Sequence, residues 1–447
     1  MANAISDGVN RLATLTERDE YFIRPVRRAT SVPVGSAIGR DHWIIDILLI
    51  AGVFAASLFN GVIGKLTPLI LMASLPALLW LRHERVFAAV ARCWPLLLLP
   101  VFALTSALWS IAPGTTAYYA TLYLVTAWLG VFLGATLGRD ATLVGLFVAF
   151  QGFNMAALLF GRMVGWGGGA FGSQAFAGLS GSKNAAGDSA ALGLMIALAT
   201  LTLALDRRWR VLTLLAAGSV LPTCWILYSA HATGALIAGT VATTCLSLWL
   251  LSRRLPVTAR GVILLAAVFV VLAAVATQSI WLQPLFDFVL QSAGKDAGLT
   301  GRTDLWRKAD ELIRERPALG LGYNAFWQIG NLDAEALWRL MGIDSRSGFN
   351  FHNTIREILV HLGFVGLALY AIVSLSATVA NFLRALQIPD PLQILACGWI
   401  VYTIMKLGFE VVGFGTLHHG AILAFTVLAI GLRPETRTRP VRVRRGG

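Results

Sequence analysis

The sequence predicts an all-α polytopic membrane protein with about twelve transmembrane helices and one large, partly helical periplasmic loop. Of its 447 residues, 57% are hydrophobic and only 13% are charged, and the mean hydropathy is +0.71. Soluble domains usually carry about 25% charged residues. A helix needs about 20 mainly apolar residues to cross a bilayer, and stretches of about that length recur along the chain.

The predicted spans cover residues 43–64, 66–82, 94–111, 115–138, 141–164, 185–205, 210–230, 232–251, 260–281, 357–383, 391–410 and 414–432. The shortest, 66–82, contains Pro68 and Pro76, which a helix bundle tolerates because neighbouring helices satisfy the freed carbonyls. The resulting organisation is a cytoplasmic segment 1–42, helices one to nine in 43–281, a loop 282–356, helices ten to twelve in 357–432 and a basic cytoplasmic tail 433–447.

The distribution of positive charge predicts that both termini are cytoplasmic. Cytoplasmic loops of membrane proteins hold the excess of Lys and Arg. In this orientation 23 of the 36 Lys and Arg residues lie in inner segments, and the short outer loops hold only Lys65, Arg162 and Lys183. The large outer loop has nine bases and, with Glu357 directly after it, ten acids, so it is nearly neutral. The net charge of +13 is therefore an orientation signal, and no nucleic-acid partner is expected.

The sequence predicts neither a metal site nor a cofactor. Its four cysteines, Cys93, Cys224, Cys245 and Cys397, lie in or beside spans and form no CxxC pair. No HExxH, GxSxG or P-loop motif is present.

Two amphipathic helices are expected inside the large loop. Residues 303–316 place apolar side chains at helical spacing, with Thr303 as the N-cap and Pro317 after the end. A second helix is expected at 334–341, capped by Asp333. With tryptophans on their apolar faces, the two helices could rest on the bilayer surface or roof a cavity.

Two positions are candidate phosphate contacts. In the glycine-rich stretch 178–187, Ser182 is expected to cap a helix whose first turn holds Lys183 and Asn184, and a helix N-terminus attracts phosphate. The alternative is a flexible loop whose lysine reaches the headgroups. Arg302 precedes the first loop helix and offers a bidentate fork, although a surface ion pair with Asp304 would explain it equally simply.

His352 is the candidate general base. It lies where the tenth span begins, and the positive end of a helix dipole favours its neutral imidazole. A headgroup contact or a helix cap is the alternative. His231, at an outer span end, could line the same cavity, whereas Lys406 and Glu410, four residues apart near the end of the eleventh span, are expected to pair with each other.

Several short motifs follow one another along the chain between the hydrophobic spans: Lys183-Asn184, Gly301-Arg302 followed by Trp306, Gly320-Leu321-Gly322, and His352-Asn353. This arrangement over roughly residues 170–410 resembles the O-antigen ligase and polymerase superfamily of bacterial envelope glycosyltransferases. That family usually has Ser-x-Ser-Arg near the end of the seventh span. Here Ser229-Ala230-His231-Ala232 lacks the arginine, so His231 is expected to replace it in part.

The resemblance implies a multi-pass protein of the bacterial inner membrane. It implies metal-independent, inverting transfer of an O-antigen glycan from undecaprenyl diphosphate to the lipid A–core oligosaccharide. Arg302 and Lys183 would bind the diphosphate, His352 would deprotonate the acceptor hydroxyl, and Asn353 would orient a substrate group or cap its helix. Asn184, His231 and Trp306 complete the expected substrate-binding set, and membrane lipids surround the protein.

Other functions remain open at this stage. An O-antigen polymerase or a protein O-oligosaccharyltransferase would use the same donor, and the single dominant outer loop favours the ligase because the other candidate loop, 165–183, is short. A transporter of lipid-linked glycans should carry internal repeats and polar groups at mid-membrane. Asp46 and Lys406 are among the few charges within the spans, which favours an enzyme.

Overall fold

The computed structural model describes residues 43–165, 173–281, 284, 302–346 and 349–433. The chain divides into two units, Met1–Trp43 and Ile44–Gly447. All of the described residues except Trp43 belong to the second unit. The predicted segment 1–42, the tail from 434 onward and the first part of the large loop lie outside the described residues.

Helices account for nearly all of the regular structure. Before the large loop they are α2 (Trp43–Leu58), α3 (Asn60–Ile63), α4 (Leu66–Leu81), α5 (His83–Cys93), η2 (Trp94–Leu97), α6 (Leu98–Thr105), η3 (Ser106–Leu108), α7 (Pro113–Thr136), α8 (Arg139–Phe160), α9 (Lys183–Arg207), α10 (Arg210–Ser229), α11 (Thr233–Ser252) and α12 (Val257–Ala276). The large loop contains α14 (Arg302–Glu315) and α15 (Leu332–Leu340), and after it come α16 (Thr354–Gln387), α17 (Pro391–Lys406) and α18 (His419–Gly431).

The predicted fold class is confirmed. Among the described residues, 8 helical segments are long and apolar enough to cross a membrane. Four shorter apolar helices, Trp43–Leu58, Leu66–Leu81, Pro391–Lys406 and His419–Gly431, correspond to the remaining predicted spans. The segment His83–Leu108 is longer than the span predicted at 94–111, because α5 continues directly into η2 and α6.

A β-hairpin interrupts the helices where the sequence suggested only a glycine-rich loop. Strand β1 (Arg162–Gly165) pairs antiparallel with β2 (Gln174–Gly178), with Met163 opposite Phe176. The fifth span therefore ends at Phe160 rather than at 164, and Gly161 has extended backbone (φ −78°, ψ 173°) that leads into the strand.

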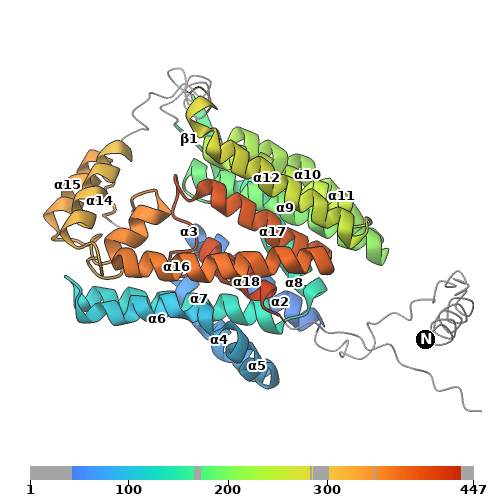
Figure 1. Ribbon diagram of the computed structural model, residues 1–447, viewed down its shortest axis with the longest axis horizontal. Coiled ribbons are helices and arrows are strands. Elements are labelled where there is room, and N and C mark those ends of the chain that lie inside the picture. Colours follow the sequence, from blue (N-terminus) through green and yellow to red (C-terminus); the bar gives the residue numbers. More distant parts are fainter. Residues whose placement is uncertain (1–42, 166–172, 282–283, 285–301, 347–348, 434–447) are drawn as a thin grey trace, which may run out of the picture. The chain divides into compact units, whose positions relative to one another are not determined.

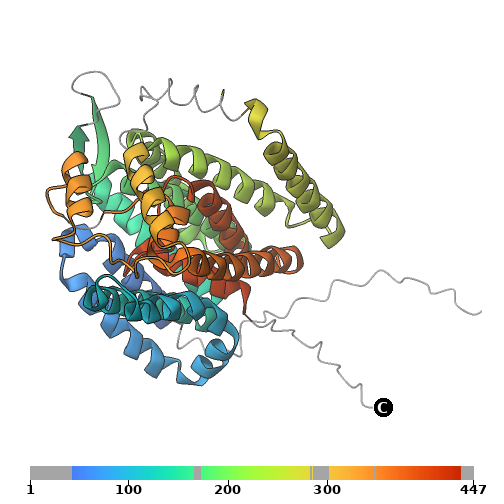
Figure 2. The ribbon, with the colours of Figure 1, turned by 60° about the vertical axis from the view of Figure 1, so that its left-hand side comes forward.

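Helix α9 is central to one group of helices, packing against α8, α10, α11 and α17. Small residues allow membrane helices to approach closely: a Cβ added at Gly239 of α11 would lie 2.8 Å from Cβ of Ala191 in α9. A second group joins α7 to α6 and α18, and α16 to α18 and α14. Helix α12 runs along the edge of the helix bundle (Figure 2), and only 6% of its most apolar stretch is buried.

Helices α14 and α15 form a small subdomain at one end of the bundle (Figure 1). Its core contains Leu305, Leu312, Phe326, Trp338 and Phe351, so the apolar faces of both helices contribute to one hydrophobic cluster. Lys308 of α14 pairs with Asp333 of α15 across 2.9 Å. The helix ends differ from prediction: α14 begins at Arg302, so Thr303 lies in the first turn, and the cap of α15 is Asn331, which accepts from the Asp333 amide at 3.2 Å.

The large loop inserts into α16 at Gly363. This glycine has φ 63° inside an otherwise helical segment. The amide of Leu321 donates to the carbonyl of Val360 at 2.8 Å, and the amide of Phe364 donates to the carbonyl of Pro317 at 2.8 Å. Backbone groups left unpaired by the helix interruption are thereby satisfied by the loop, as buried polar backbone requires.

Replacing Gly363 by alanine is expected to destabilise the protein. A Cβ there would lie 2.3 Å from the backbone of Ala318, and a left-handed conformation costs a residue with a side chain about 1–2 kcal/mol. We expect a lower midpoint of thermal unfolding in detergent. Gly218→Ala in α10 is the matched control because nothing lies within 4 Å of its added Cβ. Equal midpoints for the two variants would contradict the assigned role of Gly363.

Candidate active site

The carboxylate of Glu410 joins three segments that are far apart in the sequence. Its Oε1 accepts hydrogen bonds from Nη2 of Arg302 at 2.9 Å and from Nδ2 of Asn184 at 3.5 Å. Its Oε2 lies 3.0 Å from Nδ1 of His352. The structure thus brings together Arg302, Asn184 and His352, which the sequence nominated as site residues. They meet at Glu410, which the sequence did not nominate.

All three partners lie at helix N-termini. Arg302 is the first residue of α14, Asn184 is in the first turn of α9, and His352 directly precedes the cap of α16. A helix N-terminus carries partial positive charge and unpaired N–H groups. Their convergence favours an anion, and the Glu410 carboxylate provides that charge here.

The cluster is shielded but reachable. The side chains of Arg302, His352 and Glu410 are 20%, 25% and 21% exposed. Electrostatic interactions in such a position are stronger than on an open surface, because less water screens them.

Glu410 lies in the loop 407–418, because α17 ends at Lys406 and not at 410 as predicted. The start of α16 holds this loop. The Thr354 amide donates to the Leu407 carbonyl at 2.9 Å, and the Thr354 hydroxyl donates to the Glu410 carbonyl at 2.7 Å. Nδ2 of Asn353 donates to the Gly408 carbonyl at 3.0 Å.

Asn353 is the N-cap of α16. Its Oδ1 accepts from the amide of Arg356 at 2.9 Å, so the capping role expected as one of two alternatives is confirmed. Together with its bond to Gly408, the cap ties the direction of α16 to the position of Glu410. A direct substrate contact for Asn353 stays a prediction.

The backbone of His352 adopts a left-handed conformation, with φ 50°. Such a conformation costs a residue with a side chain about 1–3 kcal/mol and is often found at functional sites. Its Nδ1 faces Glu410, and among the described residues none hydrogen-bonds to its Nε2. When Nδ1 carries the proton and donates a hydrogen bond to Glu410, Nε2 is the basic nitrogen.

Lys183 and His231 form a neighbouring pair. Nζ of Lys183 donates to the His231 carbonyl at 3.0 Å, and Ser182 caps α9 by accepting from the Ala185 amide at 3.2 Å, as predicted. His231 also has a left-handed backbone, with φ 48°. Because Lys183 adjoins Asn184, this pair flanks the Glu410 cluster along the start of α9.

Trp306 supports the segment before His352. Its Nε1 donates to the Phe351 carbonyl at 3.0 Å, and the Arg356 guanidinium lies 5.1 Å from the centre of its ring. Arg356 is itself held by Asp310 at 2.8 and 3.1 Å. These contacts of Trp306 are all within the protein. A substrate contact for Trp306 stays a prediction.

The predicted pairing of Lys406 with Glu410 is wrong. Lys406 forms an ion pair with Asp188 of α9, whose Oδ1 also accepts from the Tyr402 hydroxyl at 2.6 Å. The four-residue spacing misleads because α17 ends at Lys406, so Glu410 is not on the next turn of the same helix. Closely spaced glycines, Gly408 and Gly413, were the available signal for a loop there.

The environment of Glu410 favours its charged form. Burial raises the pKa of this carboxyl, but the hydrogen bond and charge of His352, with the charges of Lys406 and Arg302, outweigh burial and lower the pKa below its ordinary value of 4.5. The carboxylate therefore remains ionised at neutral pH.

Because the pKa of Glu410 is lowered in the folded state, the stability of the protein depends on pH. The stabilisation from Glu410 is fully present above its ordinary pKa of 4.5 and is lost as the pH falls through the lower folded-state value. We expect the thermal unfolding midpoint in detergent to decline in that range, and Glu410→Gln to weaken the decline. Asp304→Asn, which alters an exposed pair with Arg307, is the control. An unchanged pH profile for Glu410→Gln would contradict this assignment.

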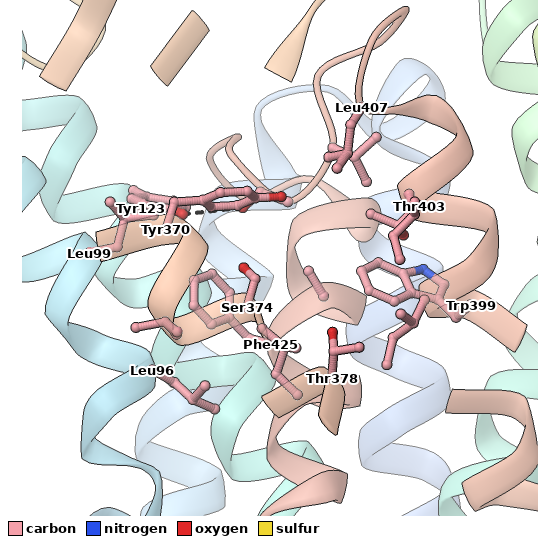
Figure 3. A pocket seen from close by; sticks show the side chains of 17 residues that line it. Leu96, Leu99, Tyr123, Tyr370, Ser374, Thr378, Trp399, Thr403, Leu407 and Phe425 are labelled. Atoms are coloured by element: carbon pink, nitrogen blue, oxygen red, sulfur yellow. Dashed lines mark hydrogen bonds between the residues drawn. The ribbon is translucent and has the colours of Figure 1, made fainter. Parts of the chain in front are cut away.

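An apolar cavity adjoins the loop that carries Glu410. Figure 3 shows Tyr123 and Tyr370 on one side, Trp399 and Thr403 on the other, and Leu407 above. The cavity volume is about 100 Å³. The cavity is bounded by η2, α6, α7, α16, α17 and α18 and by the 407–413 segment. An apolar chain could therefore lie within a few residues of the charged cluster.

Comparison with known proteins supports an assignment for part of the chain. Residues 217–371 match the family described as O-antigen ligase. The chain is 32% identical over 255 residues to the exopolysaccharide production protein ExoQ of Rhizobium meliloti (strain 1021), an alignment that covers 57% of this chain and 58% of that relative. The chain thus spans less than two thirds of the relative's length.

The family match contains Arg302, His352 and the whole large loop, whereas Asn184 and Glu410 lie outside it. Two of the three side chains on the Glu410 carboxylate therefore come from the matched region, and the ordered motifs from Arg302 to Asn353 fall within it. Residues 217–371 are therefore similar to the O-antigen ligase family, and the identity to ExoQ, which covers 57% of this chain, supports that similarity.

Proposed function

We propose that the chain is a glycosyltransferase that moves a glycan from undecaprenyl diphosphate to a hydroxyl group of a second substrate. The observation that carries this proposal is the convergence of Arg302, Asn184 and His352 on one carboxylate at three helix N-termini. Positive charge, N–H donors and a basic nitrogen meet there. A diphosphate leaving group and an acceptor hydroxyl need these groups together.

The donor diphosphate binds at Arg302 and Lys183. Only one guanidinium nitrogen of Arg302 bonds Glu410, and a guanidinium has five N–H donors, so Arg302 can hold phosphate oxygens as well. When the bond between the anomeric carbon and the diphosphate oxygen breaks, negative charge grows on that oxygen. Arg302 and Lys183 stabilise this charge, and Asn184 and His231 complete the anionic pocket.

His352 acts as the general base. Nδ1 donates to Glu410, and Nε2 takes the proton of the acceptor hydroxyl while its oxygen attacks the anomeric carbon from the side opposite the diphosphate. One C–O bond forms, one breaks, and the configuration at the anomeric carbon inverts. The Glu410 charge stabilises the imidazolium that results.

The apolar cavity supports a donor with a long hydrocarbon chain. Its lining is almost entirely apolar, and Leu407 and Val412 belong to the loop that carries Glu410. The first part of a polyprenyl chain there would keep its diphosphate at the cluster while that part stays out of water. Ile404, which also lines the cavity, is 57% exposed, so the chain could enter from the lipid.

Two acceptors are candidates. The motif resemblance favours lipid A–core oligosaccharide as the acceptor and a bacterial inner membrane as the location. The distribution of Lys and Arg favours a site on the periplasmic face with both termini in the cytoplasm. The name of the relative, exopolysaccharide production protein, favours a second candidate, polymerisation, in which the acceptor is another lipid-linked glycan. The chemistry at Arg302 and His352 is the same in both cases.

The test is a reconstituted assay with undecaprenyl-diphosphate glycan, with and without rough lipopolysaccharide, in the presence of EDTA. Glycan on lipid A–core supports the ligase, and longer lipid-linked chains without it support the polymerase. Movement of intact donor across the bilayer with no covalent product would overturn the proposal in favour of a transporter.

A further inference from the structure

Glu357 places a buried carboxyl group in the first turn of α16. It is 4% exposed. Its Oε2 accepts from the amide of Phe351 at 2.8 Å, and its Oε1 lies 3.4 Å from Nε2 of His361. A buried polar group is unfavourable unless it is hydrogen-bonded. The Phe351 amide provides that hydrogen bond for Glu357, and neither Phe351 nor His361 is one of the proposed substrate-binding groups.

The bond to Phe351 controls the residue directly before His352. The left-handed backbone of His352 is unfavourable for a residue with a Cβ, so neighbouring contacts must maintain it. Phe351 is held at both ends of its backbone: Glu357 binds the amide, and Trp306 binds the carbonyl at 3.0 Å. Its ring is fully buried against Phe326 and Trp327.

The other side of Glu357 leads to the glycine turn of the large loop. Nδ1 of His361 accepts from the Asn324 amide at 3.3 Å, and its carbonyl accepts from the Gly322 amide at 3.0 Å. The Tyr323 ring packs edge-on against His361, with 5.7 Å between centroids. Glu357 and His361 therefore connect the turn at 320–324 to the segment that carries His352.

We propose that Glu357 is a positioning residue for His352. By holding the Phe351 amide, it keeps the His352 backbone left-handed, so that Nδ1 meets Glu410 and Nε2 faces the acceptor hydroxyl. This inference rests on the proposed function, in which His352 is the base. Glu357 itself contacts neither substrate, and its effect on turnover passes through the orientation of His352.

The experiment compares Glu357→Gln, Glu357→Asp and Glu357→Ala in the reconstituted transfer assay, each alone and combined with His352→Ala. Glutamine keeps an oxygen for the Phe351 amide, so it should retain most of kcat. Aspartate keeps the carboxyl group but is too short to reach Phe351. We expect aspartate and alanine to lower kcat about 10- to 100-fold with little change in KM, because a misplacement of about 1 Å can cost that much.

The double variants test whether the effect passes through His352. Residues that act as a unit are not additive, so Glu357→Asp should lower kcat no further when His352 is already alanine. Glu335→Ala is the matched control: this shielded α15 carboxylate also accepts from a backbone amide, that of Gly330 at 3.4 Å, and pairs with Arg346. It should leave kcat unchanged.

The outcomes separate the two proposals. Full activity of Glu357→Asp, loss of activity in Glu357→Gln, or additive losses with His352→Ala would each overturn the role of Glu357. Full activity of His352→Ala would instead overturn the general base. Size-exclusion profiles in detergent identify folded protein, and the comparison of glutamine with aspartate remains decisive if alanine prevents folding.

Discussion

Replacement of His352 by alanine is expected to lower kcat of glycan transfer by about 10²- to 10⁴-fold, the range that general-base catalysis contributes. Nε2 is the nitrogen that would accept the hydroxyl proton, and alanine removes it. The Glu410 carboxylate keeps Arg302 and Asn184 as partners, so the fold should survive. The measurement is single-turnover transfer by reconstituted protein, with donor binding determined separately.

Two further variants sharpen this prediction. His352→Gln can still donate a hydrogen bond to Glu410 but has no basic nitrogen, so it should be as inactive as the alanine variant. His83→Ala removes an exposed histidine whose Nδ1 lies 3.1 Å from the Trp80 carbonyl, and activity should be unchanged. Near-normal transfer by folded His352→Ala would refute the assignment of the base.

Replacement of Arg302 by alanine is the second change with a large expected effect. Removing a preorganised charge that stabilises a leaving group typically costs about 10²- to 10³-fold in rate, and we expect a loss of that size in kcat. Weaker donor binding should accompany it, because the diphosphate also contacts Arg302 in the ground state. The measurement is the rate of transfer together with the affinity for undecaprenyl diphosphate.

Arg302→Lys separates charge from geometry. Lysine keeps the positive charge but lacks the planar fork, so partial activity is expected, between alanine and wild type. Arg307→Ala on the same helix is the control, since its pair with Asp304 is exposed and such pairs contribute little. Equal activity of Arg302→Ala and Arg307→Ala would show that the diphosphate binds elsewhere.

Hydropathy and local capping patterns were sufficient to predict most of the helices. Each predicted span corresponds to an observed apolar helix, because the cost of placing polar groups in lipid acts on each stretch of about 20 residues independently. Ser182 and Asn353 cap α9 and α16 as expected, since a cap depends only on residues within one turn. Errors of a few residues arose at Thr303, Asp333 and the end of α17, where several residues could begin or end the helix.

The motif order nominated Arg302, Asn184 and His352 but could not relate them in space. Glu410 was not nominated as a site residue because its expected partner was Lys406, one helical turn away. The actual partner of Lys406 is Asp188, which comes from α9. Pairings of this kind depend on which helices lie side by side, and nothing local in the sequence encodes that.

The sequence by itself determined that this chain is a polytopic helical membrane protein and which of its polar motifs are candidates for function. Only the tertiary structure decided that three helix N-termini meet at Glu410, that the large loop inserts into α16 at Gly363, and that Glu357 holds the backbone before His352. The physical reason is range: hydrophobic length and caps are local properties, whereas these contacts join segments whose separation is set by packing of the whole bundle.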